Sequence, residues 1–301
     1  MLERVGFVGL GGMGGPMASN LMKAGYGMVL HNRTREKAEK LAEEGEGEVA
    51  DTPREVAERC DVVITMLPGP SEVETVVSRE GGLFEAMRRN LLVVDMSTSS
   101  PTLARELARR AREREASMLD APVSGGDVGA QEGTLSIMVG GEEADFERAK
   151  PLFEAMGKTV THLGPAGAGQ VVKACNQIVV ALVIEAVSEA LVLGSKGGVA
   201  PEKILNVLGG GLAGNKVMEI KREKMLSGHF EPGGKVEYHH KDLGIALAAG
   251  REYGVSLPAT AIVDQMFGVL VAQGRGGWDH SALVTLVEDW SRQDARGQAR
   301  E

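Results

Sequence analysis

The pattern of apolar and polar positions changes character about halfway along the chain. Up to residue 163, short β-branched runs alternate with amphipathic stretches, as in βαβ units that form a parallel sheet. We expect strands at 4–8, 27–31, 61–66, 91–96, 117–121, 135–139 and 159–163. We expect helices at 13–24, 34–44, 53–59, 71–78, 101–114 and 142–156. Thr34, Thr52 and Ser100 are expected N-caps, and Pro53 and Pro101 follow the last two at the first helical position.

After residue 164 the strand-like runs give way to long helical patterns rich in alanine, leucine and valine. Glycines and prolines interrupt these patterns, at 197–198, 209–214, 228–234, 258 and 274–277. The fold class predicted is α/β, with a Rossmann-type doubly wound parallel sheet at 1–163. An all-α domain for substrate binding and oligomerisation follows at 164–301, and a long helix joins the two.

Charge and cysteine content narrow the function classes. The chain has 33 basic and 42 acidic residues, a formal charge of -9, which argues against nucleic acid or an anionic membrane as a partner. Cys60 and Cys175 have neither metal-ligand nor redox spacing. The N-terminus lacks the basic-then-apolar pattern of a signal peptide, and no apolar stretch reaches about 18 residues. We therefore expect a cytoplasmic protein without a membrane span.

A glycine-rich pattern follows the first expected strand. Gly9-Leu10-Gly11-Gly12-Met13-Gly14 fits the dinucleotide fingerprint, in which glycines allow a tight turn and close approach of a pyrophosphate. The same spacing recurs at Gly209, Gly211 and Gly214, so the spacing alone is uninformative in a chain with 41 glycines. Only the first match lies between a strand and a helix. We predict that the cofactor loop uses Gly9, Gly11, Gly12, Met13 and Gly14.

The end of the second strand indicates which dinucleotide binds. An NAD site usually has an acidic residue there, whereas arginine suits the 2′-phosphate of NADP. This chain has Asn32-Arg33-Thr34 and no carboxylate before Glu36, which favours NADP over NAD. Arg33 could instead be an ordinary solvated residue at a helix start.

Two further strand ends should border the cofactor, because ligands gather at the carboxyl ends of parallel strands. These are Met66-Leu67-Pro68 and Ser97-Thr98. Turn chemistry alone could also account for the proline and serine there.

The substrate side is predicted from two later segments. Asp120-Ala121-Pro122-Val123-Ser124-Gly125-Gly126 places glycines beside a hydroxyl, an arrangement that suits a carboxylate. Lys173, Asn176 and Gln177 share one face of the apolar helix that starts after Gly164. Polar groups on a buried helix need a partner or a ligand, although a snorkelling lysine is the simple alternative. The combination predicts hydride transfer to a carbonyl, with Lys173 exchanging the proton and Asn176 assisting.

These motifs together resemble the β-hydroxyacid dehydrogenases, the family of 3-hydroxyisobutyrate dehydrogenase, over nearly the whole chain. The motifs are 9–18, 120–126, 167–176 and Lys241-Asp242-Leu243. The resemblance implies that Ser124, Gly125 and Gly126 bind substrate and that Lys173 is the catalytic acid or base with Asn176 assisting. It also implies that Thr98 and Lys241 lie near the nicotinamide end.

Within the family, the tartronate semialdehyde reductases share the Asn176-Gln177 pair, where many members have two asparagines. They are also similar at 209–214, 257–258 and 279–283. This resemblance favours reduction of 2-hydroxy-3-oxopropionate to glycerate and makes Gln177 a substrate-binding candidate.

Several alternatives stay open. 3-Hydroxyisobutyrate, glyoxylate and succinic semialdehyde are other possible substrates, because short acids differ by few atoms. A non-catalytic dinucleotide-binding module is the competing class. His239 and His240 are adjacent and should point to different helix faces, so we expect no metal site there; the part played by His280 is open too. The expected partners are a small carboxylate-bearing substrate and further copies of the chain, as a dimer or tetramer.

Overall fold

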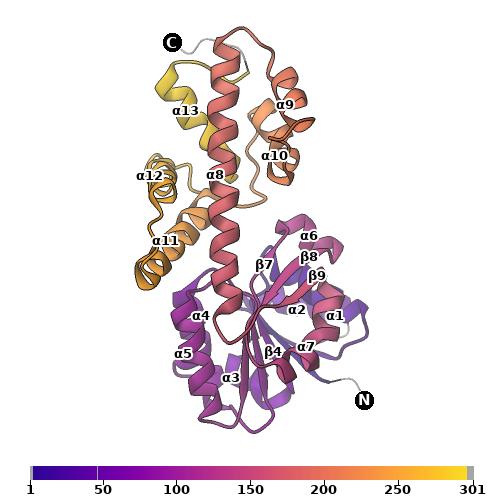
Figure 1. Ribbon diagram of the computed structural model, residues 1–301. Coiled ribbons are helices and arrows are strands. Elements are labelled where there is room, and N and C mark those ends of the chain that lie inside the picture. Colours follow the sequence, from indigo (N-terminus) through magenta and orange to yellow (C-terminus); the bar gives the residue numbers. More distant parts are fainter. Residues whose placement is uncertain (1–2, 46, 297–301) are drawn as a thin grey trace. The chain divides into compact units, whose positions relative to one another are not determined.

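The computed structural model describes residues 3–45 and 47–296. Its chain divides into two compact units that meet between Lys173 and Ala174, within helix α8 (Ala168–Lys196). Figure 1 labels many of the elements, which are numbered in chain order. The division leaves the first turn of α8, with Lys173, in the α/β unit.

The α/β unit contains a parallel sheet in the strand order β3-β2-β1-β4-β5-β6. Its strands are β1 (Val5–Val8), β2 (Met28–His31), β3 (Glu48–Val49), β4 (Val62–Thr65), β5 (Leu92–Asp95) and β6 (Ser117–Asp120). The helices between them are α1 (Gly14–Lys23), α2 (Arg35–Gly45), α3 (Pro53–Arg59), α4 (Pro70–Ser78) and α5 (Pro101–Arg112), with the short helix η1 (Leu83–Glu85). This order is that of a Rossmann-type sheet, and it places the topological switch between β1 and β4.

Two expected strands do not join this sheet. The prediction that 135–139 and 159–163 extend the parallel sheet is wrong: β8 (Leu135–Val139) and β9 (Gly157–His162) form a separate sheet with β7 (Val123–Ser124). β7 runs antiparallel to β8. The chain leaves the larger sheet after Asp120 and then pairs with β8 instead. One bond of this new pairing runs from Met138 N to Pro122 O. Apolar alternation predicts a strand but does not determine which edge it pairs with.

Helices α6 (Gly126–Glu132) and α7 (Glu143–Met156) complete this unit. The sequence did not predict α6, a short helix of seven residues that begins directly after Gly125. Two of the three predicted N-caps form; at Thr34, Lys37 N donates to the backbone oxygen instead of the hydroxyl. Glu55 N donates to Thr52 Oγ1 and Leu103 N to Ser100 Oγ, both at 3.1 Å.

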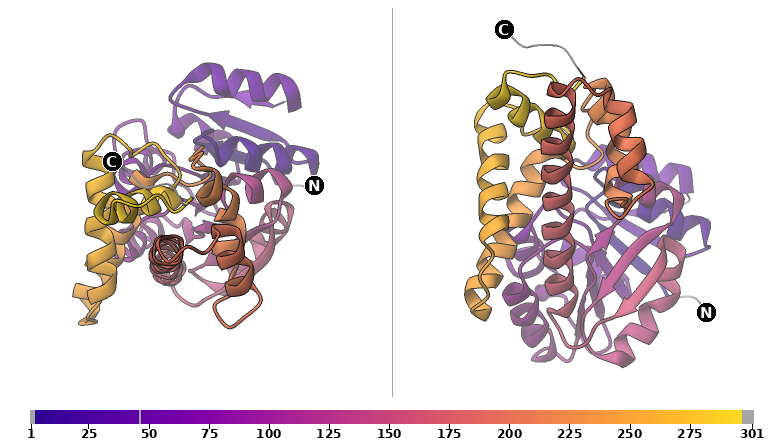
Figure 2. Two further views of the ribbon diagram at one scale, coloured as in Figure 1. Left: turned by 90° about the horizontal axis from the view of Figure 1, so that it is seen from above. Right: turned by 45° about the horizontal axis from the view of Figure 1, so that its top comes forward.

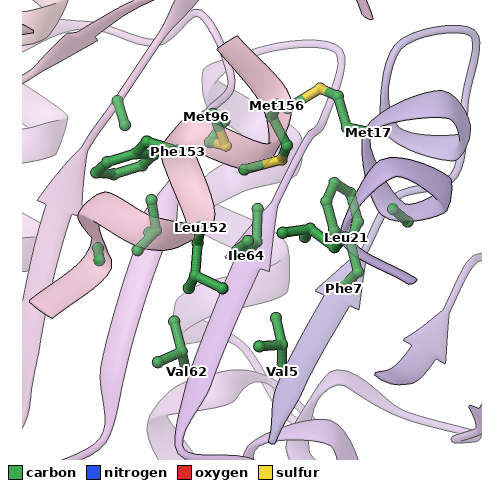
Figure 3. Close-up of a cluster of buried hydrophobic side chains, with 14 of the residues drawn as sticks. Val5, Phe7, Met17, Leu21, Val62, Ile64, Met96, Leu152, Phe153 and Met156 are labelled. Carbon is green, nitrogen blue, oxygen red and sulfur yellow. The ribbon is translucent and has the colours of Figure 1, made fainter. Parts of the chain in front are cut away.

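Both faces of the parallel sheet are covered, which explains why its strands are apolar at successive positions. On one face Phe7 and Ile64 pack against Met17 of α1 and Phe153 of α7 (Figure 3). The other face packs on α3, α4 and α5. The sheet is therefore a rigid frame for the loops at the carboxyl ends of its strands.

The helical unit is built around the remainder of α8, a long unbroken helix (Figure 2). Its other elements are α9 (Pro201–Gly209), α10 (Lys216–Ser227), α11 (Val236–Tyr253), α12 (Pro258–Ala272), η2 (His280–Ala282) and α13 (Leu283–Ser291). By length and composition α8 could cross a membrane, contrary to the sequence expectation. A core helix passes the same test, and Ile184 and Leu191 are fully buried in the core of this unit.

Candidate active site

The glycine loop after β1 is tightly built at its ends and open in the middle. Gly9 has φ +98°, and a Cβ there would lie 2.3 Å from Met66 O. A Cβ on Gly14 would lie 1.9 Å from Gly9 O, whereas Cβ atoms on Gly11 and Gly12 would meet nothing within 4 Å. Gly9 and Gly14 are thus required by the fold, and Gly11 and Gly12 leave space before the N-terminus of α1. These are the features that a bound pyrophosphate requires.

Asn32 connects the end of β2 to the glycine loop. Leu10 N donates to Asn32 Oδ1 at 2.9 Å, and Asn32 Nδ2 donates to Thr34 O at 2.8 Å. The Asn32 side chain therefore shapes the cofactor loop, a role that its position in the sequence did not reveal.

Arg33 lies beside a small pocket at the end of β2, which His31, Arg35 and Asp51 also line. The neighbouring Arg35 is paired with Glu39 and Asp51. Arg33 is exposed and forms no hydrogen bond or ion pair with any residue in 3–45 or 47–296. Its guanidinium is thus available to an anionic ligand at this strand end.

The ends of β4 and β5 are joined next to this loop. Leu67 N donates to Ser97 Oγ at 2.8 Å, and Ser97 N donates to Asp95 Oδ1 at 3.1 Å. Met66 O lies against Gly9. Met66, Leu67 and Thr98 therefore lie at the carboxyl edge of the sheet, with Pro68 directly after Leu67. Their contact with the cofactor stays a prediction. The anchoring carboxylate of Asp95 was not predicted.

Lys173 meets the predicted substrate loop. Its Nζ donates to Val123 O at 2.8 Å, and the side chain is only 7% exposed. Ser124 follows in β7, and Gly125 and Gly126 have φ of +135° and +64°. The structure thus brings together two segments that lie 50 residues apart. A lysine ammonium can donate a proton, and successive backbone N–H groups in a glycine-rich loop can bind an anion.

Asp120 connects the substrate loop with the start of α8. Its Oδ1 accepts from Gly167 N at 2.7 Å and its Oδ2 from Gln170 N at 2.9 Å. Burial raises the pKa of Asp120, the two amides lower it, and nearby Asp95 adds a smaller increase, so that the resulting pKa is about 6. Neither Asp120 as an anchor nor Gln170 was singled out in the sequence, although a charge at the end of a buried strand was a usable signal.

In the helical unit, a chain of polar contacts joins three predicted site residues. Asn176 Nδ2 donates to Gln177 Oε1 at 2.8 Å, and Gln177 Nε2 donates to Asp242 Oδ2 at 2.6 Å. Lys241 forms an ion pair with Asp242 at 2.9 Å. Gln177 therefore holds Asn176 and Asp242 in place, and its contact with substrate stays a prediction. The Asp242 carboxylate links Gln177 to Lys241, and the sequence did not predict this role.

The three histidines lie in two separate places. His239 contacts Gln177 O through Nε2 at 3.1 Å and His280 Nδ1 through Nδ1 at 2.7 Å. His240 pairs instead with Asp264 at 2.8 Å. Within the described part of the chain, no group of three or more His, Cys, Asp or Glu residues is arranged to hold a metal ion.

The second glycine pattern has a different setting. It follows helix α9, and a Cβ on Gly214 would lie 2.6 Å from Gly209 O. These glycines therefore pack the turn between α9 and α10, and a helix rather than a strand precedes them.

Two family models match the chain. Residues 4–164 match the NAD binding domain of 6-phosphogluconate dehydrogenase. Residues 167–287 match the NAD-binding domain of NADP-dependent 3-hydroxyisobutyrate dehydrogenase. Together they cover both units.

Individual proteins are similar over almost their full lengths. The chain is 46% identical to 2-hydroxy-3-oxopropionate reductase of Escherichia coli, over 95% of this chain and 97% of that protein. The structure of 3-hydroxyisobutyrate dehydrogenase from Mycobacterium tuberculosis with L-serine matches with a TM-score of 0.86 at 33% identity, covering 95% and 99% of the two chains. A structure described as Psf3 with NADP+ and 2-OPP matches with a TM-score of 0.85 at 25% identity, covering 94% and 99%.

Proposed function

Because the chain belongs to the 3-hydroxyisobutyrate dehydrogenase family of NAD-binding oxidoreductases, we propose that it is an NADPH-dependent reductase of a short β-oxo acid. The substrate proposed is 2-hydroxy-3-oxopropionate, which would be reduced to glycerate. The observation that supports the proposal is the hydrogen bond from Lys173 Nζ to Val123 O, because it joins the proposed proton donor to the proposed substrate loop. The similarity to the Escherichia coli reductase supports the choice of substrate.

Each of the site residues has a separate role in the proposed reaction. Ser124, Gly125 and Gly126 hold the substrate carboxylate. When bound, NADPH supplies the hydride that the carbonyl carbon receives. The Lys173 ammonium gives its proton to the carbonyl oxygen, which becomes the new hydroxyl, and the neutral amine regains a proton from solvent. Asn176, one helical turn after Lys173, orients the substrate, and Gln177 fixes the Asn176 amide.

The cofactor is proposed from the open glycine loop and from Arg33. Gly11 and Gly12 leave room for the pyrophosphate. The Arg33 guanidinium, which forms no ion pair with the described residues, suits a 2′-phosphate. NAD is the less favoured alternative. Lys241 lies next to Asp242 in α11 and is proposed to line the nicotinamide end, as in the family.

The second candidate is a 3-hydroxyisobutyrate or L-serine dehydrogenase, which the similarity to the Mycobacterium tuberculosis structure favours. Glyoxylate and succinic semialdehyde are further candidate substrates. One methyl group changes discrimination by only about 1–3 kcal/mol, so relative rates must decide.

A rate panel tests the proposal. Wild type is assayed on 2-hydroxy-3-oxopropionate, succinic semialdehyde and glyoxylate with NADPH and NADH, and on 3-hydroxyisobutyrate and L-serine with NADP+ and NAD+. We expect the highest kcat/KM for 2-hydroxy-3-oxopropionate with NADPH. Lys173→Ala should bind NADPH as wild type does and lose roughly 10²–10⁴-fold in kcat.

The matched control is Lys203→Ala, which removes an exposed lysine from α9. It should retain wild-type rates. Equal rates for wild type and Lys173→Ala would remove Lys173 from the mechanism, and absence of turnover on every compound would favour a non-catalytic dinucleotide-binding protein.

A further inference from the structure

The first turn of α8 is fastened to the end of a distant strand. A helix start leaves amide groups without intrahelical partners, which a local Ser, Thr or Asp usually caps. Here Asp120, at the end of β6, accepts from Gly167 N and Gln170 N with one oxygen each, at 2.7 and 2.9 Å. The residue is 3% exposed. A buried carboxylate from the sheet thus caps the N-terminus of α8 in place of a local side chain.

The side chain of Gln170 fastens the same turn to a second strand end. Gln170 Nε2 donates to Ser97 O at 2.8 Å, and Ser99 N donates to Gln170 Oε1 at 2.9 Å. A residue of a neighbouring parallel strand would make the same two bonds, one through its N–H and one through its C=O. They lie on either side of Thr98, so the Gln170 amide fixes the backbone that carries Thr98.

The backbone of α8 lies very close to the sheet at this turn. A Cβ on Gly169 would lie 2.3 Å from Met138 O and 2.7 Å from Asp120 O. A Cβ on Gly140 would lie 2.6 Å from Asp120 Oδ1 and 2.8 Å from Gly169 N. Only glycine fits at either position, and the backbone of α8 therefore packs directly on the end of β8 and the glycine that follows it.

Lys173 comes one turn after Gln170, and its Nζ reaches Val123 O at 2.8 Å. The position of this ammonium relative to the Thr98 segment and to the 123–126 loop thus depends on the bonds of Asp120 and Gln170. Neither of these side chains is among the residues assigned to substrate or cofactor above.

We propose that Asp120 and Gln170 are positioning residues, which lock the first turn of α8 to the ends of β5 and β6 and so place Lys173 and Thr98 together. This inference rests on the proposed function for the role of Lys173. We call the four hydrogen bonds made by the side chains of Asp120 and Gln170 the clamp. A displacement of a catalytic group by about 1 Å can lower the rate on the order of 10²-fold, so loss of the clamp should act mainly on kcat.

Two isosteric variants test the clamp. Gln170→Glu places a carboxylate oxygen against Ser97 O, and Asp120→Asn places an amide NH2 against a backbone N–H. Each keeps side-chain size and reverses the polarity of one bond. At pH 8, above the pKa of Asp120, we expect each variant to lower kcat about 10–100-fold and to change the substrate KM less than threefold.

Amide exchange supplies a readout that needs no turnover. Hydrogen exchange at Ser99, Gly167 and Gln170 should be at least tenfold faster in the variants, while exchange in α12 stays unchanged. NADPH titration gives the concentration of folded enzyme, to which kcat is normalised. The matched control is Gln265→Glu on the exposed face of α12, which should behave as wild type in all three measurements.

The outcomes separate the clamp from the proposed function. Faster exchange with unchanged kcat would show that the bonds only stabilise the fold and would overturn the positioning role. Unchanged exchange in both variants would overturn the clamp itself. Failure of wild type to reduce any semialdehyde would refute the proposed function, and the role of Asp120 and Gln170 in placing Lys173 would fall with it, even if the exchange data supported the clamp.

Discussion

Arg33 is the single residue on which the proposed cofactor choice depends. Its neighbour Arg35 is occupied by Glu39 and Asp51, whereas Arg33 has no such pair among the described residues. A hydrogen bond to a charged group contributes about 1.5–3 kcal/mol. We therefore predict that Arg33→Ala weakens NADPH binding roughly 10–100-fold and leaves NADH binding within about twofold, as measured by nucleotide fluorescence titration.

Arg35→Ala is the matched control, because it removes an arginine that already has carboxylate partners. It should change the ratio of NADPH to NADH affinity much less than Arg33→Ala. If Arg33→Ala leaves that ratio unchanged, the 2′-phosphate role is wrong.

Among the elements of the helical unit, the short helix η2 is held by a buried charge. Asp279 is fully buried and accepts from Ser281 N, Ser281 Oγ and Gly233 N at 3.1, 2.7 and 2.9 Å. Lys221 of α10 completes the site with an ion pair of 2.9 Å. Burial alone would raise the pKa of Asp279, but His280 and Lys221 outweigh it and lower the pKa to about 2.

Breaking this ion pair should destabilise the helical unit. Removal of the Lys221 ammonium leaves the buried Asp279 charge with only His280 and the longer contact to Lys224, at 4.0 Å, to offset it. We therefore expect Lys221→Met to lower the free energy of unfolding by about 3 kcal/mol, the lower end of the range for a broken buried pair. Both tryptophans, Trp278 and Trp290, belong to this unit, and their fluorescence in urea reports its unfolding.

The double variant Lys221→Met/Asp279→Asn should recover part of the lost stability, since the introduced amide keeps a cap acceptor without the charge. Lys216→Met, which breaks the exposed pair with Glu219, should cost less than about 1 kcal/mol. Equal losses for the buried and exposed pairs would contradict the assignment.

At the scale of the whole molecule, α8 keeps an apolar face uncovered. Val179 and Leu193 are 59% and 76% exposed, and the exposed Ala186 lies midway between them at heptad spacing. Identical helices can pair along such a face, so we propose a second copy of the chain as its partner. The formal charge of -9 makes salt a useful variable, because association of like-charged copies strengthens with screening.

We predict that the protein forms an oligomer in solution, which its molar mass reveals. Light scattering after size exclusion should give a dimer or tetramer for wild type, and Val179→Glu/Leu193→Glu should reduce that mass. Val255→Glu, which alters an exposed valine between α11 and α12, serves as the control. A monomeric wild type would refute the proposal, and an unchanged mass in the double variant would place the interface elsewhere.

Local patterns in the sequence were sufficient for most of the helices and strands, though not for the short helix α6. Strand periodicity, glycine spacing and capping residues act over a few neighbouring positions, so the Rossmann-type unit, the helical unit and the loop at Gly9 to Gly14 could be predicted. Lys173 and the 123–126 loop were predicted separately, because each has its own composition signal.

Tertiary structure decided which of these parts meet and what holds them. Three sets of contacts join residues far apart in the chain. They are the pairing of β7, β8 and β9, the hydrogen bonds of Asp120 to the start of α8 and of Gln170 to Ser97, and the link through Asp242. A buried polar side chain must find a partner, but its sequence neighbourhood does not say which one, because the partner is chosen by packing of the whole fold.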